Sequence, residues 1–119
     1  MKNLTGLGVI VECLIRSNLV IEANIYTQNS IDFASFIENT AIDDSCCLIS
    51  YDGITNIGYN EDGTVDTYDN VFSVYIKLKE ITEKTIQDII KKFNDISVGL
   101  MIINNMSIEN GVIVIGITI

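Results

Sequence analysis

Residues 46–78, CCLISYDGITNIGYNEDGTVDTYDNVFSVYIKL, decide the fold of this chain. Aromatic and β-branched residues dominate the stretch, and both kinds favour strands. Two polar segments interrupt it: Asp52-Gly53 is a typical hairpin turn, and residues 60–63 (NEDG) are a second turn signal. The pattern therefore predicts four extended segments, at residues 46–51, 54–59, 64–68 and 71–78.

The segment that follows predicts the clearest amphipathic helix of the chain. Thr82 is a candidate N-cap and Gly99 a candidate stop. Between them, apolar residues recur about one helical turn apart, at Ile86, Ile89, Ile90, Phe93 and Ile96. This spacing places an apolar stripe on one face of the helix, and we expect that stripe to pack on the sheet.

The C-terminal residues predict a hairpin of two strands, at 100–108 and 112–119. Asn110-Gly111 between them is the strongest two-residue hairpin signal in the chain. Such a turn pairs Ile108 with Ile113, and it also pairs Met106 with Ile115. Because both faces of residues 112–119 are nearly apolar, we expect this strand inside a sheet, covered on both sides. The alternative is an oligomer contact that covers its second face.

The N-terminal residues permit two interpretations. Apolar residues alternate over 9–15 and 19–25, which favours a hairpin with a three-residue loop and Asn18 in the left-handed conformation. Its register places Ile15 opposite Leu19, Cys13 opposite Ile21 and Val11 opposite Ala23. The competing interpretation is a helix over residues 4–20, against which Gly6, Gly8 and the β-branched residues count. A short helix over residues 30–41 follows in either case.

Together these elements predict an α+β fold: a two-layer domain in which one antiparallel sheet of about six to seven strands carries two helices. A length of 119 residues suits a single domain, residues 1–119. The longest uncharged apolar runs are too short to cross a bilayer, and the N-terminus is a poor signal peptide. We therefore expect a cytoplasmic protein whose cysteines, Cys13, Cys46 and Cys47, are buried thiols.

Charge is distributed unevenly along the chain. Residues 17–76 contain no lysine, arginine or histidine, and the other 59 residues hold six acids and seven bases. The net charge of −9 therefore belongs to ten acids of this one stretch: Glu22, Asp32, Glu38, Asp43, Asp44, Asp52, Glu61, Asp62, Asp66 and Asp69. Nucleic acid and anionic membrane surfaces repel such a protein. We expect a protein partner with a basic surface, and neither direct nucleic-acid binding nor membrane binding.

The candidate partner-binding residues are the acids and tyrosines of the predicted hairpin region: Asp52, Tyr59, Glu61, Asp62, Asp66, Tyr68 and Asp69. Acids in turns and at hairpin edges can converge at one end of a sheet, and tyrosine is enriched in interface cores. The competing interpretation is that these acids are solvated and only keep an unusually apolar domain in solution.

Neither a catalytic site nor a cofactor or metal site is predicted. Residues 58–69 imitate part of an EF-hand loop, but a flanking helix pair is missing. Asp43-Asp44 has no nearby histidine or lysine for acid–base work. Gly6-Leu7-Gly8 lacks the third glycine of a dinucleotide fingerprint. We therefore expect a protein that is not an enzyme and that uses no cofactor.

In size and charge the chain resembles small acidic α+β inhibitors such as anti-CRISPR proteins and toxin-immunity proteins. That resemblance implies an inhibitor of viral or mobile-element origin that occupies a basic, nucleic-acid-binding surface of a target protein. The order of elements from Cys46 onward is instead similar to phage tail-terminator and related ring-forming tail proteins. This alternative implies a structural subunit of a phage-like assembly, and hence a homo-oligomer. The predicted N-terminal hairpin departs from it, because such proteins usually begin with a helix.

Overall fold

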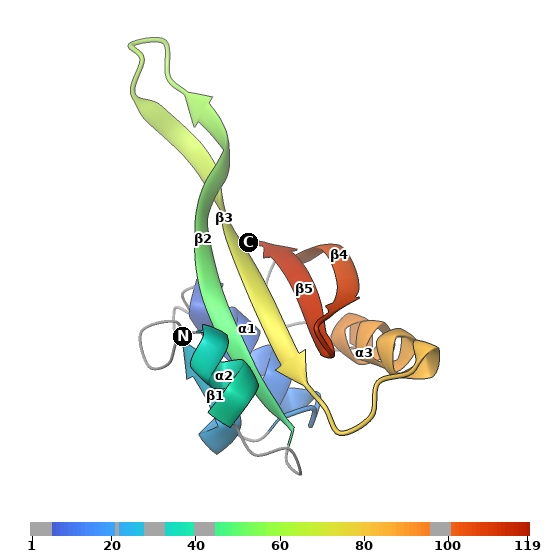
Figure 1. The fold of residues 1–119 in the computed structure, drawn as a ribbon. Helices are drawn as coiled ribbons and strands as arrows, with labels where there is room; N and C mark the ends of the chain where they lie inside the picture. Colours follow the sequence, from blue (N-terminus) through green and yellow to red (C-terminus); the bar gives the residue numbers. More distant parts are fainter. Residues whose placement is uncertain (1–5, 21, 28–32, 40–44, 96–100) are drawn as a thin grey trace.

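The computed structural model describes residues 6–20, 22–27, 33–39, 45–95 and 101–119 (Figure 1). In chain order its elements are α1 (Gly6–Arg16), the short 3-10 helix η1 (Glu22–Asn24), β1 (Ile25–Thr27), α2 (Phe33–Asn39), β2 (Cys46–Tyr59), β3 (Val65–Lys77), α3 (Glu83–Asp95), β4 (Ile102–Glu109) and β5 (Val112–Thr118).

The described strands form one mixed sheet in the order β1-β2-β3-β5-β4. β1 runs parallel to β2, and the other neighbouring pairs are antiparallel. The predicted α+β class is confirmed. The predicted antiparallel sheet of six to seven strands with two helices is wrong, because the described residues form five strands and three α-helices.

β2 is one strand of 14 residues, although Asp52-Gly53 predicted a hairpin turn inside it. The register shifts between Tyr51 and Gly53, so Asp52 is accommodated as a bulge, and Gly53 has a φ of 118°. A bulge bends a strand without reversing it. The segments predicted at 46–51 and 54–59 are therefore one strand, and those predicted at 64–68 and 71–78 are also one strand, β3.

The N-terminal hairpin predicted over residues 9–25 is wrong, because residues 6–16 form α1. The buried residues of α1 follow helical spacing: Val9, Ile10, Cys13 and Leu14. Asn18 does adopt the left-handed conformation, with a φ of 59°, but it ends the helix. Its N–H donates to the carbonyl of Ile15 over 3.1 Å. A left-handed residue is a common helix terminator. Ile21, which the hairpin placed opposite Cys13, lies outside the described residues.

The C-terminal hairpin is confirmed together with its register. Asn110 and Gly111 both have positive φ, 53° and 74°, as a two-residue hairpin turn of this kind requires. Ile108 lies opposite Ile113, and Met106 lies opposite Ile115. β5 is an interior strand, with β3 on one side and β4 on the other. The predicted α3 is also present, while its predicted last residues, Ile96 and Gly99, lie outside the described residues.

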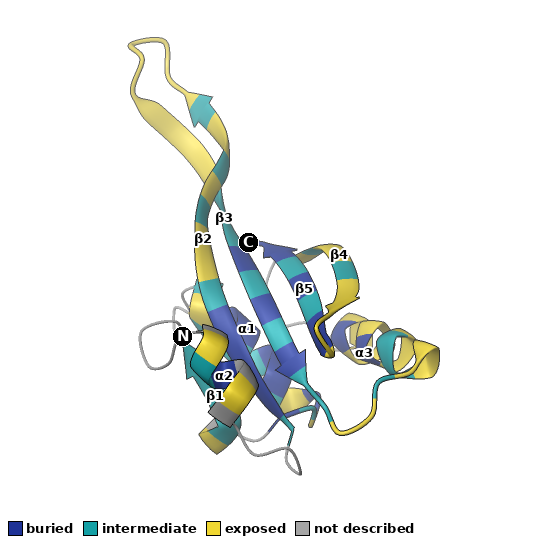
Figure 2. Ribbon diagram, in the orientation of Figure 1, coloured by how far each residue is buried: buried dark blue, intermediate teal, exposed yellow. Residues whose placement is uncertain are grey.

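Helices cover both faces of the sheet, so the predicted two-layer arrangement is corrected (Figure 1). α1 and α3 pack on one face with residues of β2, β3 and β5, including Ile49, Val74 and Ile115. On the other face, Phe36 of α2 packs against Leu48 and its neighbours. α2 confirms the described part of the helix predicted over residues 30–41. Figure 2 shows this buried body as the dark part of the ribbon.

β2 and β3 continue beyond the body as a two-stranded ribbon. β1 pairs with β2 only at residues 47–49, and β5 pairs with β3 only at residues 71–76. The last contact with β5 is a pair of backbone hydrogen bonds between Asn70 and Ile119, of 2.7 and 2.8 Å. Residues 52–69, which we call the arm, therefore pair only within the ribbon that β2 and β3 form. The arm projects from the sheet in Figure 1 and lengthens the molecule to 53 Å.

Candidate protein-binding arm

The arm carries all seven residues predicted to bind a partner. Six of them are exposed and Asp69 is half-buried. Tyr59 and Tyr68 are the most open of the aromatic side chains that the structure describes, 64% and 54% exposed. Figure 2 shows the arm as an almost continuously exposed ribbon. The structure thus gathers the predicted residues on one element, in two strands and the turn between them.

The seven residues do not share one face of the arm. Side chains alternate along a strand, so Tyr68 lies on the same side as Phe72, which faces the α1 and α3 layer. Asp69 lies on the opposite side, and the register shifts again between Gly58 and Tyr59, so that Asp66 is an extra residue in β3. A partner that wraps the tip would contact both faces, whereas a flat partner would contact one.

A network of hydrogen bonds shapes the tip of the arm. Asn60 N–H donates to the carbonyl of Thr64 over 2.7 Å, and Gly63 N–H donates to the carbonyl of Asn60 over 3.0 Å. One carboxylate oxygen of Asp62 accepts both the hydroxyl of Thr64, at 2.6 Å, and its N–H, at 2.9 Å. These bonds, with the hydroxyl contributing most, hold the pKa of Asp62 below its ordinary value. The tip therefore keeps an ionised carboxylate at neutral pH.

A second bulge lies halfway along the arm. The register shifts between Thr55 and Gly58, and Asn56 has a φ of 52°. The amide of Asn56 donates to the carboxylate of Asp69 over 3.0 Å. Asp69 therefore has a structural role in the arm itself, in addition to the partner-binding role that the sequence suggested.

The base of the arm is anchored in the core. Tyr51 donates its hydroxyl to the side-chain oxygen of Asn70 over 2.9 Å, and its ring lies 5.2 Å from the ring of Phe72. On the other face, the carboxylate of Asp52 accepts hydrogen bonds from the hydroxyls of Ser50 and Ser73. Asp52 thus joins the two strands where the arm leaves the body.

Sequence reasoning missed the apolar side chains that the arm exposes. Ile54 is 48%, Ile57 38% and Val65 50% exposed, and neither the body nor the opposite strand covers them. Their exposure gives the arm an apolar surface beside its five acids, and no lysine or arginine lies within residues 52–69.

The remaining candidate chemistry lies apart from the arm. All three cysteines are buried and free. Burial raises the pKa of Cys13 to about 11, and burial together with neighbouring Cys46 raises that of Cys47 to about 12. Among the described residues, no three carboxylate, thiol or imidazole side chains converge as metal ligands would. None of the helices in the described part of the chain is both long and apolar enough to cross a membrane. Asp43-Asp44 lies outside the described residues.

Comparisons with protein-family models, with curated proteins and with solved structures find no match to this chain.

Proposed function

We propose that this chain is a non-enzymatic structural subunit of a phage-like assembly, similar to the ring-forming tail-terminator proteins, and that the arm joins one copy to the next. The observation that carries the proposal is the projecting arm, whose Ile54, Tyr59, Val65 and Tyr68 are about half exposed or more. A two-stranded ribbon is at best marginally stable in water by itself. Contact with a neighbouring subunit would bury these side chains and stabilise the ribbon.

The order of elements also supports this proposal. The predicted N-terminal hairpin departed from the tail-terminator pattern, in which the chain usually begins with a helix. Residues 6–16 form a helix, so this departure is removed. From α1 onward the order is helix, a short 3-10 turn with a short parallel strand, a short helix, long hairpin, amphipathic helix and terminal hairpin. The buried, free cysteines suit a reducing compartment such as the cytoplasm, where such assemblies would be built.

Shortening the arm tests the proposal. Thr55 lies opposite Asp69, so residues 56–68 can be replaced by Asn-Gly, which closes a two-residue hairpin at that pair. We expect the intact chain to sediment as an oligomer at micromolar concentration and the shortened chain to sediment as a monomer. Circular dichroism and thermal unfolding provide the control, because the body should stay folded. An intact chain that remains monomeric would overturn the proposal.

A second candidate is an acidic inhibitor of the anti-CRISPR or immunity type, whose arm occupies a basic, nucleic-acid-binding surface of a target protein. It is favoured by Glu61, Asp62 and Asp66, which are exposed on an arm without a base. Under this candidate the chain is monomeric, and its binding to the target weakens steeply with salt. The triple variant Glu61→Lys, Asp62→Lys, Asp66→Lys would abolish that binding. Binding that is insensitive to salt would exclude this candidate.

A further inference from the structure

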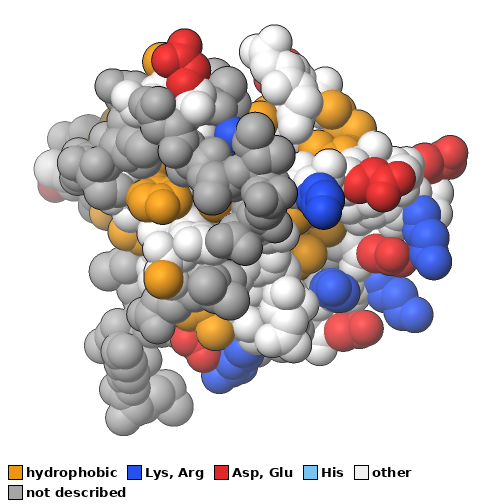
Figure 3. Space-filling view, turned by 60° about the horizontal axis from the view of Figure 1, so that its bottom comes forward, with side chains coloured by type: hydrophobic (Ala, Val, Ile, Leu, Met, Phe, Trp, Pro, Cys, Tyr) orange, Lys and Arg blue, Asp and Glu red, His pale blue; other side chains and the backbone are white. Residues whose placement is uncertain are grey.

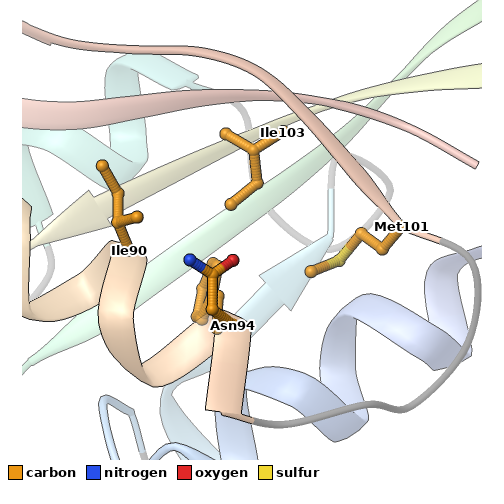
Figure 4. A pocket seen from close by; sticks show the side chains of 5 residues that line it. Ile90, Asn94, Met101 and Ile103 are labelled. Atoms are coloured by element: carbon orange, nitrogen blue, oxygen red, sulfur yellow. The ribbon is translucent and has the colours of Figure 1, made fainter.

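We infer that the tip of the arm of one copy docks in an apolar hollow between α3 and β4 of a second copy. This inference rests on the proposed function, and it names the surface that receives the arm. The hollow has a volume of about 350 Å³ and is lined by Ile90, Phe93, Asn94, Met101 and Ile103. Figure 4 shows Ile90 and Asn94 on α3 facing Met101 and Ile103 at the start of β4.

The hollow offers apolar surface that the body does not cover. Ile90 is 39% exposed, and Met101 and Ile103 are only partly buried. One amide, that of Asn94, interrupts this apolar lining. Four of the five named side chains are apolar, while polar atoms supply nearly half of the exposed lining. Apolar side chains beside polar groups are typical of a site that takes an aromatic anchor with a polar end, such as a tyrosine.

The charge around the hollow selects the arm as its occupant. Residues 77–95 hold five of the seven bases of the chain and four acids, whereas residues 17–76 hold none of the bases. On the right of Figure 3, over α3, lysines alternate with acids. Lys91 precedes Asn94 by three residues and follows Lys84 by seven, so both lysines flank the side of α3 that borders the hollow, which also carries Glu83. Residues 77–95 therefore carry a net charge of +1, opposite in sign to the five acids of the arm.

The tip of the arm matches this surface. Tyr59 and Val65 are paired, so their side chains lie next to each other on one face, 64% and 50% exposed. Glu61 and Asp62 follow directly in the tip turn, where Asp62 stays ionised. With Tyr59 and Val65 in the hollow, the two carboxylates come within reach of Lys84 and Lys91. An apolar anchor inside a charged rim is the usual arrangement of a protein interface.

The contact must join two copies, because the tip cannot reach the hollow of its own chain. Ile103 lies opposite Ile117, and Ile117 lies opposite Phe72, so the hollow is level with Phe72. Val65 is seven residues further along β3, about 23 Å away at about 3.3 Å per residue. Figure 1 shows the arm continuing away from β4 and α3. A contact between two different surfaces is head-to-tail, and repetition of it gives a closed ring or an open filament.

Mixing two assembly-defective variants tests this inference. The first is the chain whose residues 56–68 are replaced by Asn-Gly, which keeps the hollow and lacks the tip. The second is Ile90→Glu, which keeps the tip and places an acid in the hollow. Ile102→Glu is the matched control, because Ile102 is 55% exposed and lies opposite Thr118, outside the hollow. Sedimentation velocity measures the mass of each chain and of the equimolar mixture.

We expect each defective variant to be monomeric and the mixture to form a heterodimer, which uses the one intact tip and the one intact hollow. Ile90→Glu should weaken self-association about tenfold or more, while Ile102→Glu leaves it unchanged. If Ile90→Glu assembles like the intact chain while the shortened chain does not, the inference is overturned and the proposed function stands. If the shortened chain also assembles, both are overturned. Lys91→Glu, at an exposed position, replaces Ile90→Glu if circular dichroism shows the latter unfolded.

Discussion

Gly6 of α1 lies so close to Phe72 of β3 that a Cβ atom at Gly6 would be 2.8 Å from Cε2 of the ring. The helix therefore begins directly on the aromatic side chain that stands at the base of the arm. Phe72 also contacts the ring of Tyr51, so α1, the sheet and the root of the arm meet at one residue.

The variant Gly6→Ala should destabilise the protein despite the better helix propensity of alanine. Propensity favours alanine by about 1 kcal/mol, whereas overpacking of a tight contact costs roughly 1–3 kcal/mol. We expect a net loss of roughly 1 kcal/mol in the free energy of unfolding, measured by chemical denaturation. In a Phe72→Leu background the same change should cost less, because the ring is gone. Equal losses in the two backgrounds would contradict the contact.

This contact also explains why sequence reasoning failed at the N-terminus. Gly6 and Gly8 counted against a helix because glycine is a poor helix former. Because Gly6 has no side chain, the helix can approach the ring of Phe72 closely. Phe72 is 66 residues away in the sequence, so local patterns do not indicate this contact. The periodicity of Val9, Ile10, Cys13 and Leu14 fits a helix, and it carried more information here than the propensities did.

Ile115→Ala should cost about 2–5 kcal/mol in the free energy of unfolding, because Ile115 is fully buried between β3 and β4. Ile108→Ala is a matched control on the same hairpin. Ile108 is 51% exposed, so its truncation should cost well under half as much as that of Ile115. Similar losses for the two variants would show that β5 is not the interior strand of the sheet.

The cysteines should resist modification in the native protein. A thiol reacts as the thiolate, and the raised pKa values of Cys13, about 11, and Cys47, about 12, leave very little thiolate at pH 8. Cys46 is buried as well. We expect a disulfide reagent to label all three thiols promptly in denaturant and only slowly without it. Prompt labelling of any of them in the folded chain would contradict their burial.

The pKa of Asp62 should respond to the loss of the Thr64 hydroxyl. The pKa of Asp62 is lower in the folded tip than in the unfolded chain. The hydrogen bonds to its carboxylate therefore stabilise the folded tip fully at pH values above the ordinary pKa. This stabilisation is lost as the pH falls through the lowered pKa of the folded tip. Thr64→Val should raise the pKa of Asp62 in an NMR titration, while the remaining backbone bond keeps part of the effect. An unchanged titration midpoint would mean that the hydroxyl bond is not made in solution.

The C-terminal half of the fold was predictable because its signals are local. Asn110-Gly111 specifies both a turn and a register, and the stripe of α3 specifies a buried face. The hairpin turn predicted at Asp52-Gly53 was wrong because these two residues suit both a hairpin turn and a bulge. Pairing with the neighbouring strand decides which of the two forms. Parallel pairing of β1 with β2 joins segments about twenty residues apart and leaves no local pattern.

The residues of the candidate site could be predicted from the sequence, but their arrangement in space could not. The acids and tyrosines of residues 52–69 stood out by composition, and the structure places them together on one arm. That the arm projects, and that Ile54 and Val65 are therefore exposed, depends on where β1 and β5 stop pairing. The hollow beside Ile90 combines residues of α3 and β4, and their proximity arises only in the folded chain.

The most direct test of arm docking is a photo-cross-link from the tip. Tyr59 is replaced by p-benzoyl-L-phenylalanine, which keeps an aromatic side chain at this exposed position, and the folded protein is irradiated at micromolar concentration. We predict a covalent dimer whose cross-linked peptide, identified by mass spectrometry, comes from residues 84–103 of a second chain. Cross-links confined to a single chain, or cross-links between chains that map away from α3 and β4, would contradict the account.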